Sequence, residues 1–249
     1  MKRFVLLALV VDLALAVQGA WALTLQGQAA YSWQDWVADN SGEYWDNPSS
    51  DPGHGNIGKE IGPQGAPPYF PGRTWVGAGG SADPEVHFTS PGSDWAAIKI
   101  ELAGLASSNK FGVYKKGDPS TSLQLFDGSA GPGASIIFNP LVTLGSTDFG
   151  FYLENPRGTW YTESHLNAPG QTSDQHFAFF EAPPLVPGLK AYYIGAEDTP
   201  FRHPTTGQPW ADRDYQDMVV YVANVPDAST WMLFLSGMPA VFLLRRKRS

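Results

Sequence analysis

The chain has 249 residues, of which 43% are apolar and 13% aromatic, so it can bury a sizeable core and wholesale disorder is excluded. Its 27 glycines and 21 prolines argue against long helices, and the absence of cysteine excludes disulfides, thiolate metal sites and cysteine nucleophiles. Residues 23–244 hold 10 basic and 23 acidic residues, a net charge of about −13, which excludes nucleic acid as a partner and favours cations such as calcium.

The first 22 residues are predicted to be a secretory signal peptide. Lys2 and Arg3 give a positive start, and an apolar stretch follows them. Ala20 and Ala22 supply the small–x–small pattern after which signal peptidase cuts. The alternative is an uncleaved membrane anchor, which the short apolar stretch disfavours. We therefore expect an exported protein that has signal peptidase as its first partner.

Residues 23–75 are predicted to form a loop-rich aromatic extension, because turn-forming residues interrupt any regular period. Two roles are open for its rings. They pack on the main domain, or they present stacking faces to sugars. Packing is the commoner role of tryptophan. The rings are Tyr31, Trp33, Trp36, Tyr44, Trp45, Tyr69 and Phe70.

Residues 76–224 are predicted to form an all-β domain, a jelly-roll-like β-sandwich. Short apolar runs recur between turn signals at the spacing of a sandwich, and residues 98–102 alternate apolar with charged side chains, as a half-buried strand does. The predicted strands are Glu85–Phe88, Trp95–Leu102, Phe111–Tyr114, Leu123–Phe126, Ser135–Phe138, Phe149–Leu153, Trp160–Thr162, His176–Phe180, Lys190–Ala196 and Met218–Tyr221.

Five carboxylates lie in two short clusters beside the last two predicted strands. The first cluster is Glu197 and Asp198, and the second is Asp212, Asp214 and Asp217. Carboxylates this close repel one another, and a cation between them relieves that cost. Calcium takes six to eight oxygen ligands in flexible geometry, so these residues form a predicted calcium site. The alternative is that Arg213 pairs with the acids and the aspartates cap turns.

The same residues resemble the domain of unknown function DUF4114. Its signature is a strand, Glu-Asp, a loop, then Asp-Arg-Asp-Tyr-Asn-Asp and a valine-rich strand. Here residues 212–217 differ from that signature only at Gln216, and the loop 199–211 carries proline instead of glycine. The resemblance covers about residues 149–222. It implies an extracellular β-sandwich of adhesin-like or matrix proteins, with no assigned activity and a calcium site at the acidic motif.

Residues 225–249 form a predicted sorting tail. A 14-residue apolar run, residues 231–244, reaches roughly 21 Å as a helix, which is shorter than the hydrocarbon core of a membrane. Four cations follow it, and they hold the end on the cytoplasmic side. The alternative is an ordinary C-terminal anchor. The residues of this layout are Val225, Pro226 and Asp227 before the run, and Arg245, Arg246, Lys247 and Arg248 after it.

This layout resembles the PEP-CTERM tails that exosortases process in Gram-negative bacteria. The family shows Val-Pro-Glu-Pro-Ser before the helix, where this chain has Asp227 and Ala228 in place of Glu and the second Pro. The resemblance implies an inner-membrane intermediate and then the cell surface, outer envelope or extracellular matrix, often with exopolysaccharide. An exosortase-like enzyme is the implied partner.

Other motifs carry less weight. Residues 53–58 match G-x-G-x-x-G but follow no strand and precede no helix, which excludes a dinucleotide fold. The five histidines show no metal-ligand spacing, so no zinc site is predicted. Glu163 and Glu181 are candidates for a glycosidase pair, because such pairs meet in space and not in sequence.

The sequence therefore predicts a non-catalytic surface or matrix protein with a calcium-stabilised sandwich. The alternatives are a carbohydrate-binding module for exopolysaccharide and a glycoside hydrolase.

Overall fold

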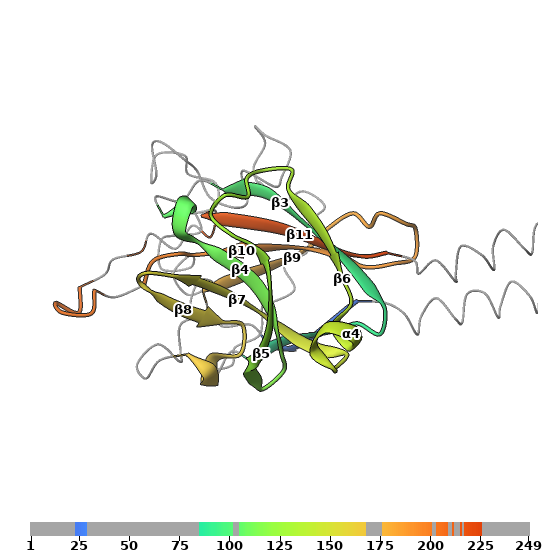
Figure 1. Cartoon of the computed structure of the whole chain (residues 1–249), viewed down its shortest axis with the longest axis horizontal. Helices are drawn as coiled ribbons and strands as arrows, with labels where there is room; N and C mark the ends of the chain where they lie inside the picture. Colours follow the sequence, from blue (N-terminus) through green and yellow to red (C-terminus); the bar gives the residue numbers. More distant parts are fainter. Residues whose placement is uncertain are drawn as a thin grey trace, which may run out of the picture.

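The protein is an all-β sandwich of two antiparallel sheets (Figure 1). The computed structural model describes residues 23–28, 85–101, 105–167, 176–200, 203–208, 211, 215 and 217–225. The predicted signal peptide, most of the aromatic extension and all of the sorting tail after Val225 lie outside these residues. In the described part, no helix has the length and apolar character needed to cross a membrane.

In the part of the chain that the structure describes, the first sheet has six strands. In order across the sheet they are β1 (Thr24–Gln28), β2 (Glu85–Thr89), β7 (Asp148–Asn155), β4 (Lys110–Lys115) and β5 (Asp118–Phe126), and β8 (Gly158–Tyr161) also pairs with β7. The second sheet has five strands: β6 (Ser135–Phe138), β3 (Ser93–Glu101), β11 (Met218–Val225), β10 (Ala191–Ala196) and β9 (Phe177–Glu181).

Within the described residues, three short helical segments connect strands: η1 (Ala106–Ser108), α4 (Pro140–Leu144) and η2 (Ser164–Leu166). The sequence explains the bounds of α4. The Asn139 side chain accepts a hydrogen bond from the Val142 N–H, and Pro140 occupies the first turn. Gly145 ends the helix in the left-handed conformation, with φ of 67°.

The core is filled by the inner faces of both sheets. Along β2, Val86 and Phe88 point inward and are fully buried, while their neighbours are half-buried, which is the alternation of a strand with one core-facing side. Phe88 makes ring contacts with Phe149 and Phe151 of its own sheet and with Phe179 of the other. These aromatic contacts join the two sheets into one core.

Each of the ten strands predicted from the sequence overlaps an observed strand, and Ser135–Phe138 agrees at both ends. The structure adds β1, which lies at the start of the predicted extension. Its sequence, Thr-Leu-Gln-Gly-Gln, is short and contains a glycine, so it carries little strand signal. Gly27 is required there, because a Cβ at this position would lie 1.7 Å from the Glu85 carbonyl oxygen.

Candidate metal centre

The strand register of the five-stranded sheet brings carboxylates together at one end. Ala196, the last residue of β10, pairs with Met218, the first residue of β11, which in turn pairs with Glu101, the last residue of β3. Glu197 and Asp198 follow β10 directly, and Asp217 precedes β11. Four acidic residues from the ends of three adjacent strands therefore lie at the same end of the sandwich.

Three of the predicted ligands lie close together. Glu197, Asp198 and Asp217 each offer a carboxylate oxygen within 4.8 Å of the others. Glu197 is 1% exposed and Asp198 is 3% exposed. The backbone N–H of Asp198 donates a hydrogen bond to Asp217 Oδ2 over 2.9 Å, which fixes the two segments against each other. The predicted grouping of these three residues is thus present in the fold.

The other two predicted ligands, Asp212 and Asp214, lie outside the described residues. Tyr215, between them and β11, is described: its ring is fully buried and its backbone has φ of 56°. A non-glycine residue in this left-handed region reverses the chain locally.

Glu101 is a member of this group that sequence reasoning missed. Its Oε1 atom is shielded from solvent and has no hydrogen-bond partner in the described part of the chain. Burial, and next the charge of Asp198, raise the pKa of Glu101 from 4.5 to about 7. A carboxyl with this pKa stands in an environment that disfavours its own negative charge. The sequence places Glu101 near the end of an alternating strand. Only the register of β3 against β11 shows that this position lies beside the other carboxylates.

Two buried asparagines connect the carboxylates to the other sheet. Asn109 donates from Nδ2 to Asp198 Oδ2 over 3.1 Å, and Asn155 donates from Nδ2 to Asn109 Oδ1 over 3.0 Å. Asn155 Nδ2 also lies 2.9 Å from the Asp198 carbonyl oxygen. Because Asn109 precedes β4 and Asn155 ends β7, this network ties the six-stranded sheet to the end of β10.

The His176 imidazole, beside the site, is held in place by contacts with the protein. His176 and Glu197 contact each other twice: the Glu197 N–H donates to the His176 carbonyl oxygen over 3.0 Å, and the ring atom His176 Nδ1 lies 3.1 Å from the Glu197 carbonyl oxygen. The His176 ring is buried and stacks on Trp160 with centroids 4.6 Å apart. The side-chain atoms of the group that could coordinate a metal are therefore carboxylate oxygens. Oxygen ligands suit a hard cation such as calcium better than zinc.

An open hollow of about 620 Å³ borders the asparagine network. Its rim carries the ion pair between Lys110 Nζ and Glu154 Oε1, which are 2.7 Å apart. This size is within the range of small-molecule sites. The lining residues are Ser107, Ser108, Lys110, Asp127, Gly128, Ser129, Glu154, Asn155 and Pro156.

A second group of metal-ligating residue types lies on the six-stranded sheet. Glu85, Glu163 and His165 have ligand atoms within 4.8 Å of one another. Their oxygens already accept hydrogen bonds: Glu85 Oε1 accepts from Ser164 Oγ and the His165 N–H, and Glu163 Oε2 accepts from the Gly117 N–H. His165 Nδ1 lies 2.8 Å from Glu85 Oε2, so the ligand atoms of this group are already engaged in hydrogen bonds.

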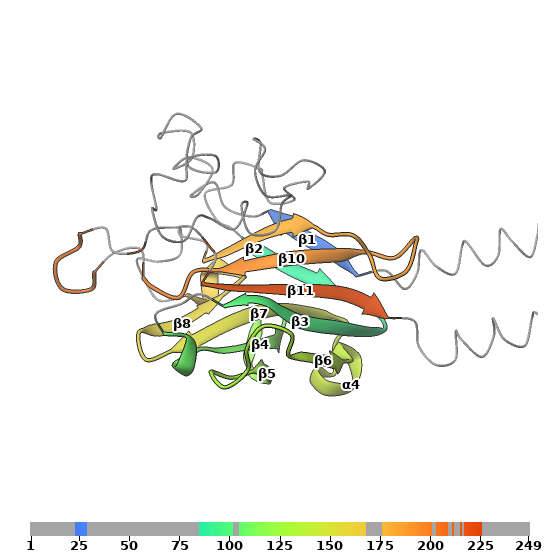
Figure 2. The same ribbon diagram turned by 90° about the horizontal axis from the view of Figure 1, so that it is seen from above.

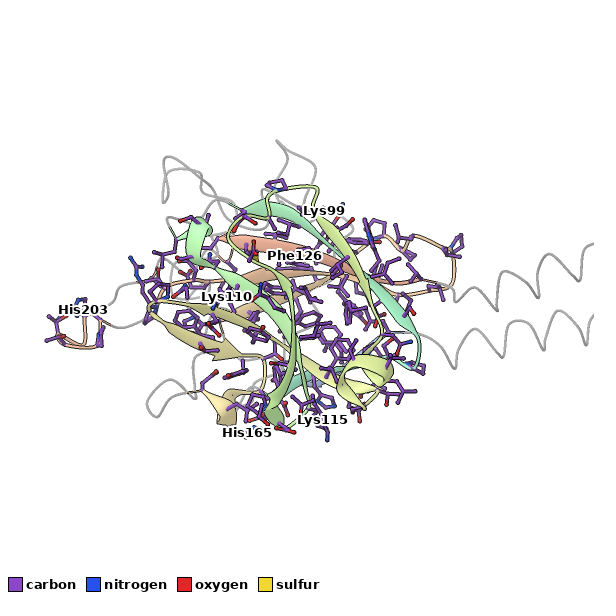
Figure 3. All side chains as sticks on the ribbon, in the orientation of Figure 1. Lys99, Lys110, Lys115, Phe126, His165 and His203 are labelled. Atoms are coloured by element: carbon purple, nitrogen blue, oxygen red, sulfur yellow. The ribbon has the colours of Figure 1, made fainter. Side chains whose placement is uncertain are left out.

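The remaining sequence candidates do not converge. Glu163 is 3% exposed beside β8, whereas Glu181 ends β9 in the other sheet, where its carboxylate lies 3.5 Å from Lys190 Nζ. Figure 3 shows His203 at the tip of the loop beyond β10, well apart from His165. Neither a glycosidase pair nor a histidine cluster is assembled from these residues.

Comparison with known proteins gives a loose match. No protein-family model matches the chain, and no curated protein matches it by sequence. Among solved structures it is similar to Chromobacterium violaceum lectin CV2L, solved in complex with α-methyl-fucoside, at 12% identity and a TM-score of 0.31. It is also similar to the Ralstonia solanacearum high-affinity mannose-binding lectin, at 13% identity and a TM-score of 0.32. Each match covers 56% of this chain and 96% of the lectin. At these TM-scores the likeness carries no functional argument.

Proposed function

We propose that the chain is a non-catalytic, exported binding or matrix protein whose sandwich is stabilised by calcium. The observation that carries the proposal is the convergence of Glu101, Glu197, Asp198 and Asp217 at one largely buried end of the fold. Export and sorting to the cell surface or matrix are supported by the two terminal sequence patterns. Asp212 and Asp214 complete the proposed ligand set from sequence.

Electrostatics favours a cation at this position. Two of these carboxylates are nearly inaccessible to solvent, so water screens their mutual repulsion poorly. Asn109 offsets part of the charge of Asp198, and the Asp198 N–H offsets part of the charge of Asp217. A calcium ion coordinates carboxylates at 2.3–2.6 Å and adds backbone carbonyls or water to reach six to eight ligands. It therefore stabilises the end of the sandwich where three strands and both sheets meet.

Thermal unfolding in calcium tests this proposal. Ligand at a hundredfold excess over Kd stabilises the folded state by about 2.7 kcal/mol. For a chain of this size that corresponds to a rise in Tm of roughly 5–10 °C. Asp217→Asn should lose most of the rise. Asp127→Asn is a matched control, because Asp127 is exposed and its hydrogen bonds join it to Ser129 and Ala130 of its own turn.

Magnesium at the same concentration separates a calcium site from general charge screening. Magnesium requires a tighter octahedral shell, so it should give a much smaller shift than calcium. Equal calcium shifts in the parent chain, Asp217→Asn and Asp127→Asn would refute a calcium site at this end.

A second candidate function is carbohydrate binding, favoured by the open hollow beside the asparagine network. Lys110 and Glu154 offer a paired donor and acceptor at its rim, which suits the neighbouring hydroxyl groups of a sugar. Titration with neutral monosaccharides, followed by calorimetry, tests it. Binding that Glu154→Gln abolishes supports this candidate, and no heat at millimolar sugar removes it.

A further inference from the structure

The N-terminal end of β1 is built into the core of the sandwich. Leu23, the residue before β1, is 0% exposed and belongs to the main hydrophobic cluster. Its backbone N–H donates a hydrogen bond to Asn224 Oδ1, near the end of β11. Leu25 is held in the same way, since its N–H donates to the Tyr192 hydroxyl of β10 over 3.4 Å. The start of this strand is therefore fixed by both sheets.

Around the Leu23 nitrogen lies a small buried polar group. Asn224 uses its other side-chain atom, Nδ2, to donate to Asp94 Oδ1 over 2.7 Å and to Ser90 Oγ over 3.2 Å. Asp94 and Ser90 are both 0% exposed, and Asn224 is 2% exposed. Asp94 and Asn224 are paired across β3 and β11. One amide side chain thus stands between the Leu23 nitrogen and a fully buried carboxylate.

Two independent observations meet at this residue. The small–x–small pattern of Ala20 and Ala22 places the signal peptidase cut between Ala22 and Leu23. The fold places the nitrogen of that same peptide bond in the buried polar group. Hydrolysis consumes one water, leaves a carboxylate on Ala22 and leaves a protonated amine on Leu23. The cut therefore creates a positive charge beside Asn224 and Asp94.

We propose that the α-ammonium group of the processed chain, at Leu23, forms a buried ion pair with Asp94 that is organised by Asn224 and Ser90. This inference depends on the export step of the proposed function. An ammonium group donates three hydrogen bonds where the peptide N–H donates one, so the new terminus has two donors available for the carboxylate besides the one that binds Asn224 Oδ1. A buried ammonium group requires a carboxylate or other acceptors beside it, and Asp94, bonded to the same Asn224 side chain, is a fully buried carboxylate at this position.

Processing thereby strengthens the fold. Among the described strands, β1 lies at the edge of its sheet and pairs with β2 alone, so its attachment depends strongly on contacts at its ends. A chain that starts upstream of Leu23 keeps the peptide bond and its single hydrogen bond. A chain that starts at Leu23 gains the ion pair and locks β1 against β11.

The test compares three chains that end at the same residue, Ser249. One starts at Leu23 with a free amine, released from an N-terminal fusion by a protease that leaves no extra residue. The second is the same chain with its α-amine acetylated, and the third starts at Trp21. We expect the free Leu23 chain to unfold with an equilibrium constant at least tenfold smaller than the other two. This difference corresponds to a Tm higher by roughly 3–6 °C.

Asp94→Asn provides the specificity control, because it keeps the shape of the side chain and removes its charge. In this background the free and acetylated chains should melt together. A second readout does not require that variant to fold: an amine-selective acylating reagent should label the Leu23 amine far more slowly in the folded chain than in urea. Equal stability of the free and acetylated chains, or rapid labelling of the folded one, overturns the ion pair. Intact mass of the exported protein tests the cleavage site separately.

Discussion

Glu101→Gln isolates the electrostatic cost of the carboxylate group without disturbing its packing. The substitution replaces one carboxylate oxygen with an amide nitrogen and keeps the length of the side chain. In the folded chain the pKa of Glu101 is raised to about 7, chiefly by burial, against an ordinary value of 4.5. The variant removes this titration, so the difference between the two proteins reports on Glu101 alone.

The sign and size of the effect follow from linkage. Below pH 4.5 both the folded and the unfolded chain hold the proton, and the two proteins should be equally stable. Between pH 4.5 and 7 the folded chain holds a proton that the unfolded chain has lost, so the parent loses stability as the pH rises. The full difference corresponds to at most about 3 kcal/mol. Because Glu101 is only half-buried, solvent screening reduces the expected gain of Glu101→Gln above pH 7 to about 1 kcal/mol.

Urea unfolding at pH 4, 6 and 8 in a calcium-free buffer measures this difference. The gain should be absent at pH 4 and complete at pH 8. With saturating calcium at pH 8 the parent should become more stable than Glu101→Gln, because the Glu101 carboxylate coordinates calcium better than the amide does. A difference between the two proteins that does not change with pH would refute the electrostatic account of the site.

Two further substitutions test the packing around the site and the core. Asn109→Ala removes the hydrogen bonds to Asp198 and Asn155 and should lower the free energy of unfolding in urea by about 2 kcal/mol. Its control, Ser108→Ala, loses one local hydrogen bond to the Leu105 carbonyl and should lower that free energy by at most about 1 kcal/mol. Gly150→Ala places a Cβ 2.4 Å from the buried Tyr114 hydroxyl and should lower the free energy of unfolding by about 1–3 kcal/mol. Its control, Gly131→Ala, has nothing within 4 Å of the new Cβ and should change that free energy by less than about 0.5 kcal/mol. Equal losses in either pair would contradict the contacts described here.

The strands were largely predictable because their pattern is local. Apolar runs such as the one at β6 stand between clear turn signals, and alternation marks β2 and β3. β1 was not predictable, since five residues with two glutamines and a glycine carry no such pattern. It is a strand because Leu23 and Leu25 are held by Asn224 and Tyr192, about 200 and 170 residues away in the chain. Tertiary contacts of this kind override local propensity.

The site was predictable in part for the same reason. Glu197, Asp198 and Asp217 flank consecutive strands, so an antiparallel pairing of those strands brings them together. Glu101 arrives from β3, more than 90 residues earlier, and only the register with Met218 reveals it. Asn109 and Asn155 come from the opposite sheet and carry no motif. Their role depends on how the two sheets are stacked, which no local pattern encodes.

The first and last described residues of the sandwich lie at the same end of it, and this has a mechanical consequence. Leu23 bonds to Asn224, the neighbour of Val225, and Figure 2 shows the start of β1 and the end of β11 at that same end. The carboxylates lie at the opposite end of β11, where the strand begins. β11 has eight residues, so roughly 25 Å separates the two ends. A tether at Val225 and a load at the carboxylate end would pull β11 along its own axis. The hydrogen bonds of its ladders to β3 and β10 run perpendicular to that axis, so tension would load them together in shear instead of opening them one by one.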